Sequence, residues 1–208
     1  MKNQKKRILL ADQLSTEPLE TKRSTAIRLY AGKLAKKIGE AIDLLCVENL
    51  TFYPDGPSPF KVLVDAFLRE QTSNAQTIAK SLPVAAKGII INGDPTKEII
   101  AAARKRDRYE LIIVGTSGRK GVQRMMLGSV AEEVIRNVQT PVMTIGPNAE
   151  SGAVNFLKSS KISILIPTSL TKNSLRAEAY GIDLAKKMGA DGQSLSSPPE
   201  PFIRQSQA

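Results

Sequence analysis

The 208-residue chain is predicted to form an α/β domain with an open, mostly parallel five-stranded sheet that carries helices on both faces. Short apolar runs rich in branched residues alternate with segments of helical spacing, and strands buried on both faces consist of such runs. The opening pattern of strand and helix also returns near the C-terminus, which indicates a partial second repeat. The expected strands cover residues 5–11, 42–47, 84–92, 111–115 and 141–145.

Helices are expected between these strands. Apolar residues spaced by four, three and four follow Ser24 and stop at Gly39, a residue type that favours a helix end. Pro83 stops the second helix. Asp94 and Pro95 form part of a turn that starts the third. The expected helices cover residues 24–38, 60–82, 98–106 and 127–138.

The chain is expected to consist of four parts. The repeat rests on two matches, ISILI with the first strand and LAKKMG with LAKKIG, and we interpret it as a truncated or frameshifted second domain. The tail is polar, rich in proline and without periodicity, so we expect it to be disordered. The parts are the first domain (residues 1–147), a linker (148–160), the partial repeat (161–191) and the tail (192–208).

Composition limits the function. An excess of 30 Lys and Arg over 20 Asp and Glu gives a formal charge of +10, which favours anionic partners. The absence of histidine removes the commonest general base and zinc ligand, and the single cysteine, Cys46, excludes an intramolecular disulfide and is expected to be buried and inert. The basic start is followed by too few apolar residues for a secretory signal, so we expect a cytoplasmic protein without a membrane partner.

The loop after the fourth strand carries the most informative motif. Gly115 and Gly118 let the backbone approach a ligand without a Cβ in the way. Gly128 and Ser129 open a helix whose free N–H groups and dipole favour an anion. Three cations lie in the same loop: Arg119, Lys120 and Arg124. A phosphate-binding loop is therefore predicted, with a structural turn as the alternative, since neither a Walker A nor a dinucleotide fingerprint fits.

The spacing Gly-x2-Gly-x9-Gly-Ser resembles the ATP-binding signature of the universal stress protein family. The likeness extends over roughly residues 5–147, through ILLAD, LLCVEN, the Gly-Asp-Pro turn and TPVMTIGP. It implies a Rossmann-like fold and an ATP-binding protein that acts in stress response or regulation.

The resemblance also implies site residues. Asp12 would contact the ribose or base, and Val47 would contact adenine through its backbone. Mg²⁺ would bridge phosphate oxygens rather than lie in a protein cage, and no catalytic residue or protein metal ligand is assigned. Alternatively, Asp12 caps a loop, Ser129 only starts a helix and Val47 belongs to the core. The other implied cofactor-binding positions, mostly around the phosphates, are Val114, Gly115, Gly118, Arg119, Gly128, Ser129 and Val130.

Three further expectations concern activity and partners. Catalysis would at most be slow ATP hydrolysis or self-phosphorylation, with Ser129 or Thr116 as acceptor. By resemblance, residues 141–146 form an edge strand that pairs across a homodimer, so a nucleotide-independent dimeric interaction protein is the alternative function. Nucleic-acid binding ranks last because the basic residues are spread along the chain. No second nucleotide site is expected, because Thr168 stands where the first copy has Asp12.

Overall fold

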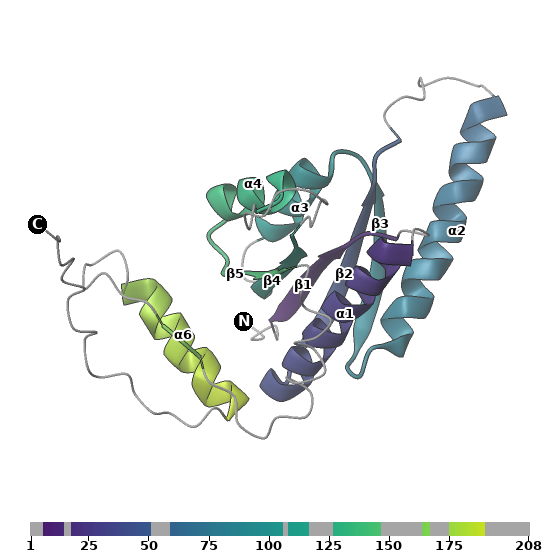
Figure 1. Cartoon of the computed structure of the whole chain (residues 1–208). Helices are drawn as coiled ribbons and strands as arrows, with labels where there is room; N and C mark the ends of the chain where they lie inside the picture. The colour runs from purple at the N-terminus through teal and green to yellow at the C-terminus, as the bar shows by residue number, and fades with distance from the viewer. Residues whose placement is uncertain are drawn as a thin grey trace, which may run out of the picture. The chain divides into compact units, whose positions relative to one another are not determined.

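A computed structural model of the chain describes residues 6–14, 18–50, 59–105, 108–116, 127–146, 164–166 and 175–189. Its centre is a five-stranded sheet with the order β3-β2-β1-β4-β5, in which every neighbouring pair is parallel (Figure 1). The predicted fold class is thus confirmed. The strands are β1 (Arg7–Asp12), β2 (Ala41–Glu48), β3 (Ala86–Asn92), β4 (Tyr109–Gly115) and β5 (Val142–Ile145).

Two pairs of helices cover the two faces of this sheet (Figure 1). Leu9, Leu45 and Val114 point to the face that packs against α3 and α4, where they join one buried apolar cluster. Residues one position along each strand point the other way, toward α1 and α2. The helices are α1 (Pro18–Ile38), α2 (Pro59–Ser81), α3 (Pro95–Ala103) and α4 (Ser129–Asn137).

Local sequence signals account for the helix ends. Gly39 follows α1 with a φ of +74°, a left-handed conformation that glycine adopts without strain. Asp94 caps α3, because its carboxylate accepts a hydrogen bond of 2.9 Å from the backbone N–H of Lys97. The first helix begins at Pro18, six residues before the predicted start, because its first turns are polar and show no apolar period. Proline is well suited to a first helical position.

The chain divides into two compact units, Met1–Ser159 and Ser160–Ala208. In the second unit the helix α6 (Leu175–Met188) ends at Gly189 with a φ of +61°, as α1 ends at Gly39. A Cβ on Gly181 would lie 3.0 Å from Ile166, so the helix contacts that residue closely. The expected strand over residues 162–166 is wrong for its described part, since 164–166 are not in a strand. Among described residues no partner strand pairs with them, and an unpaired strand leaves its backbone groups unsatisfied. The linker, the tail and Thr168 lie outside the described residues.

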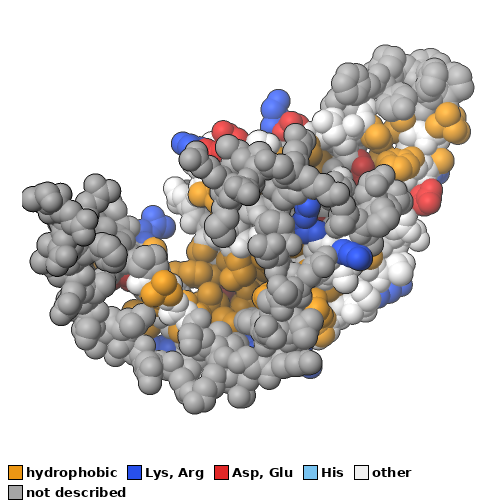
Figure 2. All heavy atoms as spheres, in the orientation of Figure 1, with side chains coloured by type: hydrophobic (Ala, Val, Ile, Leu, Met, Phe, Trp, Pro, Cys, Tyr) orange, Lys and Arg blue, Asp and Glu red, His pale blue; other side chains and the backbone are white. Residues whose placement is uncertain are grey.

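Exposed apolar side chains gather on the first half of α2, away from the sheet (Figure 2). Val62 and Leu63 are 67% and 65% exposed, whereas Ala75 and Ala79 farther along the helix are buried. Within the described part of the chain, no helix combines the length and the apolar character needed to cross a membrane.

Candidate functional site

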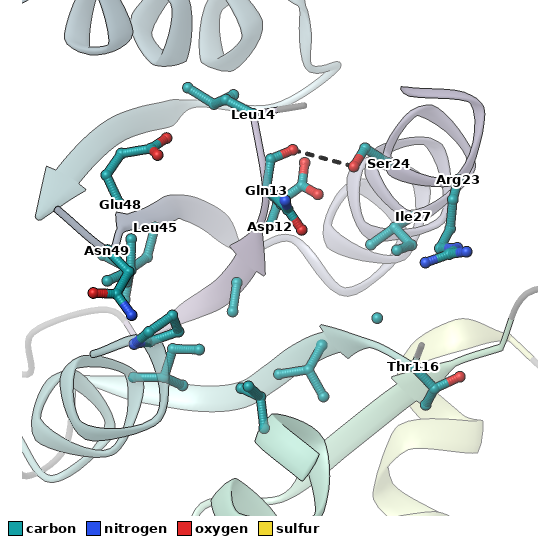
Figure 3. Close-up of a pocket in the computed structure, with 17 residues that line it drawn as sticks. Asp12, Gln13, Leu14, Arg23, Ser24, Ile27, Leu45, Glu48, Asn49 and Thr116 are labelled. Carbon is teal, nitrogen blue, oxygen red and sulfur yellow. Dashed lines mark hydrogen bonds between the residues drawn. The ribbon is translucent and has the colours of Figure 1, made fainter. Parts of the chain in front are cut away.

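A cavity of about 370 Å³ lies at the carboxyl ends of β1, β2 and β4 (Figure 3). The order of the strands in the sheet switches sides at this point: β2 and β3 lie on one side of β1, and β4 and β5 lie on the other. Ligands of open α/β sheets bind at such a switch point. The described lining residues are Ala11, Asp12, Gln13, Leu14, Arg23, Ser24, Ile27, Leu45, Val47, Glu48, Asn49, Pro95, Ile99, Val114, Gly115, Thr116 and Val130.

One part of the cavity is apolar. Val47 from the end of β2 and Ile99 from α3 belong to this wall, and Pro95 closes it at the start of α3. Ile99 is held in place because it is part of the core cluster beneath α3 and α4. Such a wall fits a flat apolar group such as a purine ring. Its other members are Leu45, Val114 and Val130.

Asp12 ends β1 and forms an ion pair with Arg28 from α1. The Arg28 Nε donates to Asp12 Oδ2 at 2.5 Å, and the Asp12 side chain is only 2% exposed. A second Arg28 nitrogen and the Ser24 hydroxyl donate to the Gln13 carbonyl, at 3.4 and 3.2 Å (Figure 3). Asp12 therefore lines the cavity while one of its oxygens binds the first helix.

Gly115 ends β4 at the cavity and is packed directly against α1. A Cβ at this position would lie 2.6 Å from Ile27 Cδ1, which is closer than carbon atoms approach in proteins. The next residue, Thr116, is 8% exposed, and its backbone N–H donates to the Ile145 carbonyl at 2.9 Å. Its hydroxyl lies 3.4 Å from the same carbonyl. Close packing against α1 thus favours glycine here, but the contact is with the flexible end of the Ile27 side chain and does not by itself require glycine.

The start of α4 presents backbone donors at the same edge of the sheet. Gly128 is the N-cap, with φ −61° and ψ 150°, and no side chain of the described residues caps the helix. The N–H groups of the first turn and the helix dipole therefore favour an anion near Ser129 and Val130. The acid of this turn, Glu132, is ion-paired with Arg136 at 2.8 Å.

Polar groups from the end of β2 line another part of the cavity. The Glu48 carbonyl accepts a hydrogen bond of 2.9 Å from Gly93, which ties β2 to the turn after β3. Burial raises the pKa of the Glu48 carboxyl. Asn49 follows it along the cavity wall. In Figure 3 both side chains lie away from Arg23 and Thr116, so the two ends of the cavity differ in charge.

Five of the predicted site residues line the cavity: Asp12, Val47, Val114, Gly115 and Val130. Gly128 and Ser129 directly precede Val130, whereas Gly118 and Arg119 lie outside the described residues. The assigned contacts of each residue with ATP stay predictions.

Sequence reasoning missed the contribution of the first helix. Arg23, Ser24 and Ile27 line the cavity because a helix that follows a strand begins at the carboxyl edge of the sheet. Their spacing of one turn, together with the predicted strand before them, was the signal that could have identified them.

A second polar cluster lies at the amino ends of the strands. The buried Asp43 carboxylate accepts hydrogen bonds from Arg7 at 2.8 Å, Arg108 at 2.8 Å and the Tyr109 hydroxyl at 2.9 Å. Burial alone would raise the pKa of Asp43, but the bonds from Arg108 and Tyr109 and the charges of Arg7 and Arg108 outweigh burial and lower it. This cluster joins β1, β2 and β4 at their amino ends, whereas the cavity lies at their carboxyl ends.

The fold defines an α/β protein with a cavity at the switch point of a parallel sheet. A family model described as the universal stress protein family matches residues 6–146. A universal stress protein of Methanocaldococcus jannaschii is 31% identical over 131 residues, which are 57% of this chain and 75% of that protein. The chain belongs to the universal stress protein family, which confirms the resemblance seen in the sequence.

Solved structures support the fold. A universal stress protein from Archaeoglobus fulgidus DSM 4304 matches with a TM-score of 0.63 and 23% identity, over 88% of this chain and 64% of that one. Another structure from Archaeoglobus fulgidus matches with a TM-score of 0.50 and 21% identity, over 67% of this chain and 98% of that one.

Proposed function

We propose that the cavity binds ATP and that the protein acts in stress response or regulation through this binding. The observation that carries the proposal is a cavity of about 370 Å³ at the switch point, with one apolar wall and one polar side, bordered by the start of α4, which no described side chain caps. Small-ligand sites commonly enclose roughly 300 to 1,000 Å³ of mainly apolar walls with a few polar groups. Adenine fits the wall of Val47, Pro95 and Ile99, and the phosphates fit the edge formed by Gly115 and α4.

Mg²⁺ is proposed to arrive bound to the phosphates. Among the described residues, no group of three or more Cys, Asp or Glu side chains could hold a metal ion. Asp12, the acid nearest to the ends of β1 and β4, is already paired with Arg28. The phosphate oxygens of the nucleotide, together with water, would therefore be the ligands of the ion.

Nucleotide retained by the purified protein tests this function. The protein is denatured, and the released small molecules are identified by absorbance and mass spectrometry. Calorimetry with ATP, in the presence and absence of Mg²⁺, then gives the affinity of protein stripped of ligand. Adenine nucleotide in the extract and saturable ATP binding are expected. The absence of both would favour the nucleotide-independent interaction protein instead.

Any phosphoryl chemistry would be slow, because the chain has no histidine that could act as a general base. Ser129 is exposed at the start of α4 and is the proposed acceptor if self-phosphorylation occurs. The Thr116 hydroxyl is poorly placed for this role, since it is buried against the Ile145 carbonyl.

The proposed partner is a second copy of the chain. The strand β5 is at the edge of the sheet, next to β4, and pairs with no other described strand. An apolar edge of this kind is an association site. Residues 141–146 are therefore proposed to form the dimer contact, and the cytoplasmic location expected from the sequence stays a prediction.

A further inference from the structure

On the basis of the proposed nucleotide site, we infer that Arg23 is a phosphate-binding residue that sets the preference for charged nucleotides over nucleosides. Arg23 is half-buried on α1 and lines the cavity. Among the described residues of that lining, it is the one positively charged side chain, facing a cavity whose other ionisable groups are Asp12 and Glu48.

The position of Arg23 follows from the packing of Ile27. Ile27 Cδ1 lies against Gly115, at the last residue of β4. Arg23 is four residues earlier, on the same face of the helix and about 6 Å farther beyond the carboxyl edge of the sheet. Figure 3 shows both side chains leaving α1 on the side of Thr116. A phosphate chain that starts near Gly115 would extend toward this guanidinium.

No described side chain neutralises the charge of Arg23. The neighbouring Arg28 is neutralised by Asp12, with which it is paired at 2.5 Å. For Arg23, in contrast, no acidic partner occurs among the described side chains. Glu48 is the other acid of the lining, and it lies at the end of β2, away from Arg23 (Figure 3). An arginine in this setting matches a phosphate group in both charge and geometry.

The uncapped start of α4 complements this cation. Its N–H groups are donors fixed to the scaffold, and Val130 brings this turn to the cavity wall. The guanidinium would bind from the α1 side and the helix start from the α4 side. Two sources of positive potential on opposite walls would hold a polyphosphate between them.

The test measures three ligands by calorimetry: ATP, inorganic triphosphate and adenosine. Arg23→Gln is expected to weaken ATP and triphosphate by roughly tenfold or more, since a charged hydrogen bond is lost, while adenosine changes by less than about twofold. Arg23→Lys keeps the charge and is expected to retain most of the affinity. Lys36→Gln, in the exposed last turn of the same helix, is the matched control for loss of one charge.

Unchanged ATP and triphosphate affinity in Arg23→Gln, with ATP bound by the wild-type protein, would overturn the role of Arg23 and leave the proposed function standing. An equal loss for adenosine would also overturn it, because Arg23 would then only shape the cavity wall. The wild-type protein could also bind triphosphate but not adenosine, with triphosphate binding lost in Arg23→Gln. That result would support the phosphate-binding role of Arg23 and overturn the assignment of the apolar wall to adenine. Failure of the wild type to bind any of the three would overturn both.

Discussion

The Asp12 carboxylate lies 2.5 Å from the Arg28 guanidinium, and 2% of the Asp12 side chain is exposed. A residue expected from the sequence to contact the nucleoside is therefore also part of the junction between β1 and α1. Removing it would leave Arg28 unpaired at a site where the arginine side chain is only 17% exposed.

We predict that Asp12→Ala lowers the free energy of unfolding by about 1.5 to 3 kcal/mol, since it deletes a charged hydrogen bond. A residue that only contacted the nucleoside could be removed without this loss. Urea unfolding of Asp12→Ala, Arg28→Gln and the double variant measures the coupling. Additive effects of the two substitutions would show that the pair does not stabilise the fold.

A second prediction concerns the Cys46 thiol. Burial, with a further effect from the charge of Asp12, raises the pKa of Cys46 to about 12. The thiolate is the reactive form, so the native protein should not react with an aromatic disulfide reagent at pH 8. One thiol per chain should react once urea unfolds the protein. Rapid modification of the native protein would instead mean that β2 opens readily.

The third prediction concerns acid stability. The pKa of Asp43 is lowered on folding. Its ionised form therefore stabilises the fold at pH values above the pKa of an aspartate in the unfolded chain, about 3.9. That contribution is lost as the pH falls through the lower, folded pKa. Wild-type stability should therefore decrease below about pH 4 more steeply than that of Asp43→Asn. Unfolding free energies measured from pH 7 to pH 2.5 provide the comparison.

Tyr109→Phe tests the hydroxyl of this cluster. It removes the group that donates to Asp43 at 2.9 Å and accepts from the Arg108 Nε at 3.0 Å, and it leaves both arginines in place. We expect a loss of about 1.5 kcal/mol at pH 7, because the acceptor is charged. An unchanged stability would show that Arg7 and Arg108 satisfy the carboxylate alone.

The sequence predicted the sheet well because each strand contains a mostly apolar run of branched residues, as in IDLLCV and LIIVG, where Asp43 is the exception. It also predicted the ends of the cavity strands, where Asp12, Val47 and Gly115 lie. The ion pairs were not predictable, since Asp12 and Arg28 are 16 residues apart and Asp43 and Arg108 are 65 apart. Spacing of this kind carries no periodic signal, and only the packed fold determines which charges meet.

Gly128 provides a prediction that separates ligand binding from folding. Its φ of −61° is accessible to any residue, so glycine is not required there by the backbone. Gly128→Ser adds a Cβ beside the proposed phosphates, while serine is a good N-cap. We expect the free energy of unfolding to stay within about 0.5 kcal/mol of wild type or to rise, and ATP affinity to fall. Equal ATP affinity in calorimetry would exclude Gly128 from the phosphate site.

The last prediction concerns association through β5. Ile112 donates to the Pro141 carbonyl and Thr116 donates to the Ile145 carbonyl. Alternate residues of a strand bond to opposite sides, so the backbone N–H of Thr144 points away from β4, toward the free edge. Thr144→Pro would remove this N–H without removing a bond between β4 and β5, and proline is tolerated on edge strands.

We expect the full chain, and a variant lacking residues 150–208, to be dimeric at tens of micromolar, and Thr144→Pro to be monomeric while it stays folded. The shortened variant retains all five strands of the sheet, so it should fold and bind ATP. Light scattering gives the mass, circular dichroism gives the fold, and Thr140→Pro, a change outside β5, is the matched control. If the shortened variant were monomeric and the full chain dimeric, the dimer contact would have to lie in the second unit. A dimeric Thr144→Pro variant would exclude strand pairing at this edge, because a strand addition across β5 needs the outward donor that proline lacks.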